Sequence, residues 1–186
     1  MLSYFDLRKG VRFILEGQPF EVLEFKQMGK AQDVVVAQTK VRNLATGKVM
    51  EKTFHQQDKF EEAEIQRIEA TFIYSHRGEF WFYKGSNPSD RFSLPESIMQ
   101  DAAPFLKKNA VLEALVFDNK VINVSLPIKM NFKVAEAPPG VKGDRAQGGN
   151  KIATLETGLK INVPLFIKEG DIVEVNTEKG EYVKRV

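Results

Sequence analysis

The sequence predicts an all-β protein built from three small barrels, and two observations predict this class. Short segments rich in β-branched and aromatic residues recur along the whole chain, and turns containing Gly, Pro or Asn separate them. A single segment, residues 93–106, carries apolar residues at helical intervals. From these patterns we place the domains at residues 1–63, 64–127 and 128–186.

The first segment reads as a run of short antiparallel strands. In "DVVVAQTKVRN" the residues from Val35 to Val41 alternate between apolar and polar, which is typical of a half-buried strand. Residues 26–32, "KQMGKAQ", are too many for a compact two-residue turn and carry two lysines, so we expect a projecting hairpin tip there. The polar residues 55–66 lack alternation and are expected to connect two units. The expected strands are "VRFILEG", "FEVLEF", "DVVVAQTKV" and "KVMEKTF", with turns at Gly17 to Pro19 and in "NLATG".

The second segment opens with two aromatic-rich strands around His76, Arg77 and Gly78. Ser93 and Glu96 have the spacing of a capping box, and an interior Pro104 predicts a short, broken helix. The strands "AVLEALVF" and "VINVSLP" follow as a hairpin around residues 118–120. This pattern fits a five-stranded barrel of the oligonucleotide-binding type. The aromatic run Phe80, Trp81 and Phe82 allows a base-stacking platform, although alternation places Trp81 opposite both phenylalanines, so at least one face is core.

The third segment predicts another small barrel. Its long loop, "PPGVKGDRAQGGNK", is rich in Gly, Pro and charge, but it lacks the spacing of a phosphate-binding loop and no helix follows it. The expected strands are "NFKVAEA", "ATLE", "LKINVP", "DIVEV" and "EYVKRV".

Composition and charge exclude several classes of protein. The chain is 42% hydrophobic and 28% charged, and its apolar runs fall far short of the roughly 18 to 20 residues that span a bilayer. No signal peptide is visible, and the absence of cysteine suits a reducing cytoplasm, where we expect the protein. A formal charge of +2 means that any nucleic-acid binding must be local.

Catalytic and metal-binding groups are scarce in this sequence. The two histidines, His55 and His76, lie in polar or turn settings, and without cysteine they cannot form an ordinary zinc site. We find no nucleophile with a base and no carboxylate pair. We therefore expect no catalytic residue, no metal and no cofactor, and a binding protein rather than an enzyme.

Spaced residues in the last third resemble a family signature. The string is Lys151, Ala153, Gly158, Ile161, Val163, Pro164, Ile167 and Gly170. Together with "APPGVKGD", "GEYVKRV", "TKVRNLATGKVMEKTF" and "GEFWFY", it resembles bacterial elongation factor P, a family related to the hypusine-containing factor of eukaryotes and archaea. The resemblance covers nearly the whole chain. Val163, Pro164, Leu165 and Ile167 are expected to be core and strand-end residues.

The resemblance implies both a fold and a function. The fold is an SH3-like (KOW) barrel followed by two oligonucleotide-binding (OB) folds, in an L shape like that of tRNA. The implied factor binds both ribosomal subunits between the peptidyl-tRNA and exit sites. There it stimulates peptide-bond formation at consecutive prolines and supplies no catalytic group. We expect a monomer, since no large apolar face is left for a partner copy.

The resemblance also implies site residues. Lys30, preceded by Gly29, corresponds to the tip lysine that contacts the tRNA acceptor end and that modifying enzymes alter in relatives. Met28 and Ala31 depart from the usual Pro-Gly-Lys-Gly tip, so both a modified and an unmodified Lys30 fit the sequence, and Lys26 stays as a spare cation. The alternative is that Lys30 is an ordinary solvent-exposed lysine of a hairpin and has no binding role.

Further contacts are implied in the third domain. Gly143, Asp144 and Arg145 correspond to a Gly-Asp-Thr loop that approaches the messenger RNA codon in the exit site, with arginine in place of threonine. Tyr182 and Arg185 correspond to residues that lie towards the small subunit. As an alternative, Tyr182 simply packs the last strand.

Two other functional hypotheses stay open. The atypical tip is compatible with an elongation factor P-like paralogue. A generic single-strand RNA-binding module would bind free RNA with a steep salt dependence, and the near-neutral charge argues against it.

Overall fold

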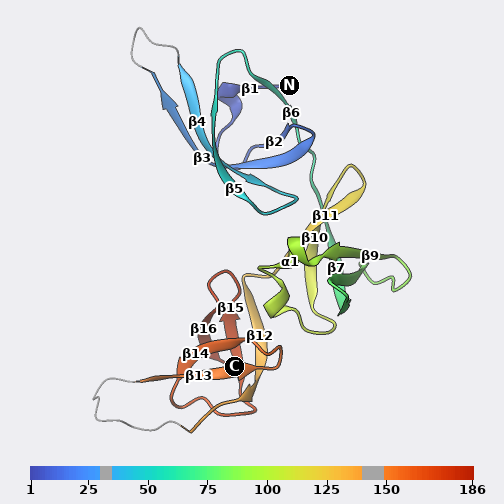
Figure 1. Cartoon of the computed structure of the whole chain (residues 1–186), viewed down its shortest axis with the longest axis vertical. Helices are drawn as coiled ribbons and strands as arrows, with labels where there is room; N and C mark the ends of the chain where they lie inside the picture. The colour runs from blue at the N-terminus through green and yellow to red at the C-terminus, as the bar shows by residue number, and fades with distance from the viewer. Residues whose placement is uncertain (30–34, 140–148) are drawn as a thin grey trace. The chain divides into compact units, whose positions relative to one another are not determined.

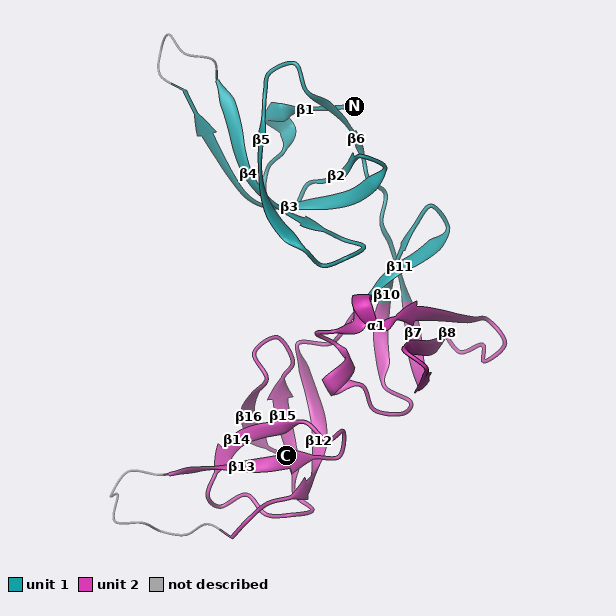
Figure 2. Cartoon of the chain, in the orientation of Figure 1, with its two compact units in different colours: residues 1–68, 114–124 teal, residues 69–113, 125–186 magenta. Residues whose placement is uncertain are grey.

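The structure, a computed structural model, describes residues 1–29, 35–139 and 149–186. Its strands form three sheets (Figure 1), with the orders β1-β6-β2-β3-β4-β5, β11-β10-β7-β8-β9 and β14-β13-β12-β15-β16. By contact the chain falls into two compact units, residues 1–68 with 114–124 and residues 69–113 with 125–186 (Figure 2). Sheets and units divide the chain differently, so the expected division at 63 and 127 stays a prediction.

The N-terminal sheet closes around an aromatic core. Phe13 is fully buried, and its ring centroid lies 5.1 Å from that of Phe60 and 5.8 Å from that of Phe54. Edge-to-face aromatic pairs of this kind stabilise a core beyond the area they bury. The strands are β1 (Leu2–Ser3), β2 (Arg12–Leu15), β3 (Gln18–Met28), β4 (Val36–Asn43), β5 (Val49–Phe54) and β6 (Lys59–Glu62), with a 3₁₀ turn at Tyr4–Asp6.

Strand β6 corrects one expectation, because residues 55–66 are not simply a connection. Phe60 pairs with Leu2 of β1, and Glu62 pairs with Phe13 of β2. Two apolar residues of this polar segment are buried, Phe60 at 7% and Ala63 at 4% exposure. One aromatic side chain gives no visible alternation, and the hydrogen bonds of β1 and β2 decide the conformation instead.

Tight hairpins join several strands, and both residues of each two-residue turn have positive φ. The turns are Glu16–Gly17, Arg77–Gly78 and Asp118–Asn119, with φ between 49° and 78°. Such turns match the right-handed twist of paired strands. The turns expected near Gly17, Gly78 and Asn119 are therefore present.

The central sheet holds the helical segment, which is broken as expected. The capping box predicted at Ser93 and Glu96 is wrong: Ser93 lies within β9, and Pro95 precedes the helix with no side-chain cap. The Ser-x-x-acid spacing instead acts at Ser3, whose N–H and hydroxyl both donate to Asp6. The elements are β7 (Gln66–His76), β8 (Glu79–Lys84), β9 (Arg91–Pro95), α1 (Glu96–Met99), a 3₁₀ turn at Ala103–Phe105, β10 (Val111–Phe117) and β11 (Lys120–Ser125).

The C-terminal sheet follows the expected strands to within a few residues. Phe132, Val134, Val173 and Val175 are fully buried and form its centre. Their alternation with exposed polar residues explains why this part of the sequence predicts its strands well. The strands are β12 (Lys129–Glu136), β13 (Asn150–Leu155), β14 (Lys160–Pro164), β15 (Ile172–Asn176) and β16 (Glu181–Arg185).

Candidate functional site on the β3–β4 hairpin

The ends of β3 and β4 form an arm that runs out from the N-terminal sheet (Figure 1), and β5 pairs with β4 along it as far as Phe54, which lies opposite Ala37. Lys26 pairs with Gln38 and Met28 pairs with Val36, so the strand pairing continues to Met28. The expectation of a tip beginning at Lys26 is wrong. Residues 36–38 present a strand edge with which residues 26–28 pair, and this pairing overrides the weak strand preference of residues 26–28.

A bulge at Leu23 determines which side chains lie on the outer face of the arm. Val22 pairs with Val41, whereas Glu24 pairs with Lys40, so one extra residue stands in β3. Val22 is buried, and without the extra residue Glu24 would point to the same side. The bulge turns Glu24, Lys26 and Met28 outward, where all are exposed.

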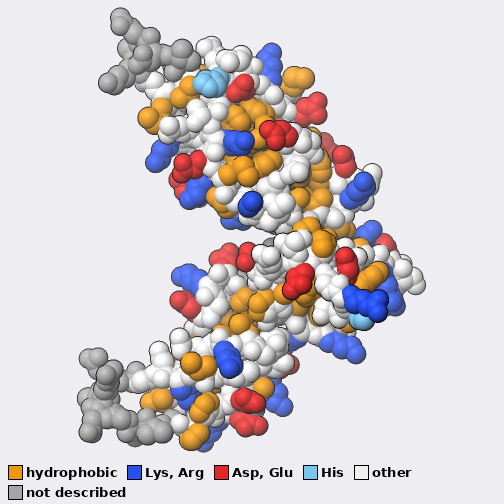
Figure 3. Space-filling model, viewed as in Figure 1, with side chains coloured by type: hydrophobic (Ala, Val, Ile, Leu, Met, Phe, Trp, Pro, Cys, Tyr) orange, Lys and Arg blue, Asp and Glu red, His pale blue; other side chains and the backbone are white. Residues whose placement is uncertain are grey.

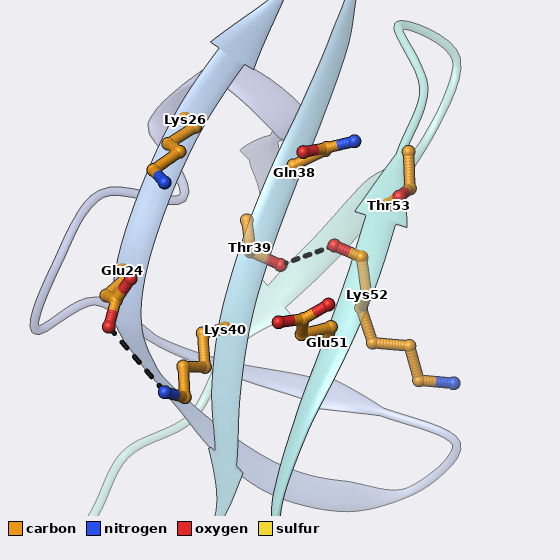
Figure 4. Close-up of a pocket in the computed structure, with 8 residues that line it drawn as sticks. All are labelled: Glu24, Lys26, Gln38, Thr39, Lys40, Glu51, Lys52 and Thr53. Carbon is orange, nitrogen blue, oxygen red and sulfur yellow. Dashed lines mark hydrogen bonds and ion pairs between the residues drawn. The ribbon is translucent and has the colours of Figure 1, made fainter.

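Charge is distributed unevenly along this outer face. Lys40 pairs with Glu24 on one side, where Nζ lies 3.7 Å from Oε1, and with Glu51 on the other. One step farther out, Lys26 faces Gln38, and no ion pair to Lys26 occurs among residues 1–29, 35–139 and 149–186. Figure 4 shows the shallow pocket over this face, lined by Glu24, Lys26, Gln38, Thr39, Lys40, Glu51, Lys52 and Thr53.

The described part of the arm ends in a close approach of its two strands. A Cβ on Gly29 would lie 3.1 Å from Cγ2 of Val35, so glycine is the residue that fits there without displacement. Met28 beside it is 48% exposed. Lys30 and Ala31 lie outside the described residues.

The long loop of the C-terminal sheet is joined at its base. Lys151 Nζ donates to the Pro138 carbonyl at 2.7 Å. Gly149 lies close to Leu165, whose Cδ1 would be 3.2 Å from an added Cβ. The predicted loop residues Gly143, Asp144 and Arg145 lie outside the described residues.

Tyr182 and Arg185 lie on the same side of β16. Tyr182 pairs with Val175, Lys184 with Glu174 and Arg185 with Val173, so Val183 is the extra residue that bulges the strand. Three residues apart, the two side chains would point to opposite faces in a regular strand. Arg185 also lies 3.8 Å from Asp171 and over the ring of Phe166, 5.6 Å from its centroid.

Most residues of the sequence string have structural roles. Ala153, Ile161, Val163 and Ile167 are buried, as expected for Val163 and Ile167, and Gly158 and Gly170 have positive φ. Lys151 closes the loop described above. The residues of this string therefore mainly stabilise the fold of the C-terminal sheet and do not by themselves identify a binding site.

Two further features would bear on function, a metal-binding cluster and a membrane-spanning helix. Within the described ranges, no three His, Cys, Asp or Glu side chains lie close enough together to hold a metal ion. No helix in these ranges is long and apolar enough to cross a membrane.

The sequence located the hairpin but placed Lys26 in its tip, whereas Lys26 lies in β3 and pairs with Gln38. The alternation of β4 predicted the outer face of Gln38 and Lys40 correctly. The only sequence feature that could have predicted the outward direction of Lys26 is the break in the apolar–polar alternation after Val22. Such breaks are common in strands that have no bulge, so the break does not identify one.

Three sheets of short, antiparallel strands define the class, an all-β protein of small barrels. Two family models match: "Elongation factor P (EF-P) KOW-like domain" over residues 3–60 and "Elongation factor P, C-terminal" over residues 130–185. The chain belongs to the elongation factor P family of translation factors.

Full-length relatives agree with this assignment. Elongation factor P of Carboxydothermus hydrogenoformans is 39% identical over 186 residues, which is 100% of both chains. That of Pelotomaculum thermopropionicum is 38% identical, again over 100% of both. The solved structure of eukaryotic translation initiation factor 5A from Methanococcus jannaschii is 13% identical with a TM-score of 0.50, covering 67% of this chain and 92% of that one. It supports the all-β, SH3-like and OB-type fold.

Proposed function

We propose that this protein binds a ribosome stalled on consecutive prolines, between the peptidyl-tRNA and exit sites. There it promotes peptide-bond formation by holding the acceptor end of the peptidyl-tRNA. It supplies no catalytic group of its own. Its family membership and the projecting arm support this proposal.

Proline chemistry explains why positioning suffices. The ring fixes φ and makes the nitrogen a secondary amine, so prolyl donors and acceptors reach the attack geometry poorly. Good orientation of reacting groups lowers a barrier by several kcal/mol. A protein with reach and a cationic end supplies this orientation.

The observation that carries the proposal is the charge pattern of the arm. Near the barrel, Lys40 is neutralised by Glu24, while farther out Lys26 faces uncharged Gln38. Positive charge without a nearby carboxylate attracts phosphates. Lys26 therefore supports Lys30, the proposed contact to the tRNA 3′ end, with Met28, Gly29 and Ala31 shaping the tip.

Further contacts extend this proposal. The loop of Gly143, Asp144 and Arg145 approaches the exit-site codon of the messenger RNA, and Tyr182 with Arg185 lies towards the small subunit. The bulged β16 supports the second assignment, because it brings both side chains to one face. We place the working protein in the cytoplasm, as a monomer of three domains.

Reconstituted translation of a message encoding Pro-Pro-Pro tests the proposal. Stalling at the second proline is compared without factor, with the unmodified protein and with Lys30→Ala. Relief that the variant loses supports an unmodified Lys30, and equal relief by both contradicts its role. If neither gives relief, intact-mass analysis of protein from its native host decides. A mass increase on the tip peptide assigns a required modification, and an unaltered mass contradicts the proposed function and favours a paralogue.

A further inference from the structure

The central sheet has an aromatic pair that the proposed function does not use. The rings of Tyr74 and Trp81 are nearly parallel, with 19° between their planes and 6.2 Å between their centroids. Tyr74 is 45% exposed and Trp81 is half-buried. An exposed pair of parallel rings in a folded domain offers a flat apolar surface to a ligand.

A bulge in β7 creates this pair. Phe72 pairs with Phe82, whereas Tyr74 pairs with Trp81, so Ile73 stands as an extra residue. Phe72 and Phe82 are buried in the barrel core. In a regular strand Tyr74 would point into that core with Phe72, and the bulge turns it outward beside Trp81.

The third strand leaves the pair open. On β9 the residue opposite Trp81 is Ser93, whose small side chain covers little of the indole. The neighbouring position on the inner face holds Leu94, which is buried. The platform therefore consists of Tyr74 and Trp81, open on the β9 side.

Cationic side chains flank the platform along the strands. Arg91 pairs with Tyr83, one same-face position from Trp81, or about 7 Å along the strand. Its Nε donates to the Pro88 carbonyl at 2.8 Å, which fixes the guanidinium and leaves its other N–H groups available. At the other end Glu79 takes the next same-face position, and Arg77 lies exposed in the turn beyond it. Figure 3 shows Lys and Arg side chains gathered on this part of the surface.

We propose that the outer face of β7, β8 and β9 binds a single-stranded RNA segment. An unpaired base stacks on Tyr74 and Trp81, and flanking phosphates contact Arg91 and Arg77. Parallel aromatic rings suit the face of any base, and Arg suits phosphate. The second and third strands of such barrels are also where oligonucleotides bind. The inference goes beyond the proposed function, since it concerns RNA binding by the free protein and needs no ribosome.

The sole tryptophan makes the test direct, because Trp81 is the only source of indole fluorescence in the 186 residues. The full chain is titrated with a nine-nucleotide adenosine RNA. We expect saturable quenching and a slope of log K against log salt near −1.4, from two phosphate contacts at about 0.7 each. A slope steeper than about −4 would indicate broad electrostatic binding and overturn the local site.

Variants separate stacking from general attraction. Tyr74→Leu should weaken binding about 5- to 150-fold, whereas Tyr74→Phe keeps the ring and should bind normally. Arg91→Gln should reduce the slope by about 0.7. The matched control is Phe5→Leu, which removes another exposed aromatic ring that an arginine, Arg8, covers.

Three further results would overturn the proposal. They are no quenching by the single strand, equal weakening by Tyr74→Leu and Phe5→Leu, or equal quenching by a blunt RNA duplex whose bases are all paired. Far-ultraviolet circular dichroism of each variant confirms that it is folded. If the leucine variant is not folded, Arg91→Gln decides, and an unchanged salt slope for that variant overturns the proposal.

Discussion

Gly29 and Val35 are in near contact across the arm: a Cβ on Gly29 would lie 3.1 Å from Cγ2 and 3.2 Å from Cα of Val35. The second distance involves backbone, which a side-chain rotation cannot relieve. The chain can approach Val35 this closely only because residue 29 is glycine and has no Cβ.

Gly29→Ala should accordingly reduce relief of proline stalling by about 2- to 10-fold, because small misplacements of a positioning group are costly. Reconstituted translation at saturating factor measures this effect. Gly47→Ala is the comparison, since its φ of 74° strains alanine in open space. It should lower stability by about 1 to 2 kcal/mol and leave relief unchanged. Equal activity of both variants would contradict the role given to the arm.

Lys26→Ala and Lys40→Ala remove the same charge from neighbouring positions of one face. Lys40 is already paired with Glu24 at 3.7 Å, whereas Lys26 faces Gln38. We expect Lys26→Ala to require about 2- to 5-fold more factor for half-maximal relief, and Lys40→Ala to change it little. A larger effect at Lys40 would mean that charge near the barrel, and not along the arm, contacts RNA.

Asn43 joins a turn to the first hairpin, and it is 4% exposed. Its Oδ1 accepts from the N–H groups of Ala45 and Thr46 at 2.9 and 3.0 Å, and its Nδ2 donates to Gln18. Asn43→Ala should destabilise the N-terminal sheet by about 1 to 3 kcal/mol, because two part-buried N–H groups lose their acceptor.

Hydrogen exchange of the β4 and β5 amides measures the effect at Asn43 locally. Asn87→Ala provides the control, since Asn87 accepts from Ser89 N–H at 3.1 Å in an exposed turn. Its cost should stay within about 0.5 kcal/mol. If Asn43→Ala and Asn87→Ala lowered stability by similar amounts, the burial of Asn43 would not explain the loss.

Lys107 follows the 3₁₀ turn of the central segment and contacts the C-terminal sheet, and both belong to the same compact unit. Its Nζ donates to the Asn131 carbonyl at 2.7 Å, lies 3.3 Å from Glu156 Oε1 and sits over the Phe132 ring. Lys107→Met should cost about 1 to 2 kcal/mol in urea unfolding followed by Trp81 fluorescence. Its exposed neighbour offers a matched substitution, Lys108→Met, which should have almost no effect.

Asp6 gives the N-terminal sheet an acid-sensitive contact. The Ser3 hydroxyl and N–H donate to its carboxylate at 2.7 and 2.8 Å, and these bonds lower the pKa of Asp6. Because the folded pKa is the lower one, the stabilisation is fully present above the unfolded pKa, about 3.9, and disappears as pH falls through the folded value. Ser3→Ala should raise the pKa towards its ordinary value in an NMR titration of the Asp6 carboxyl carbon. If the pKa of Asp6 did not change in Ser3→Ala, a group other than the Ser3 hydroxyl would be responsible for lowering it.

The family and the candidate tip could be predicted because both depend on local residues. The string from Lys151 to Gly170 and the hairpin lysines are legible without a fold. The pairing of Lys26 with Gln38 was not predictable, since it depends on the register that β3 takes against β4. Strand β6 was missed for a related reason, because the edges of other strands impose its conformation.

The sequence by itself determined where most strands and turns fall, because alternation and turn residues act over a few neighbouring positions. Tertiary structure alone decided which way several side chains point. Leu23 and Ile73 look like ordinary strand residues, yet each is left over when its strand pairs, and every residue beyond it changes face. The partner strand's hydrogen bonds fix that register, and the outward positions of Lys26 and Tyr74 follow from it.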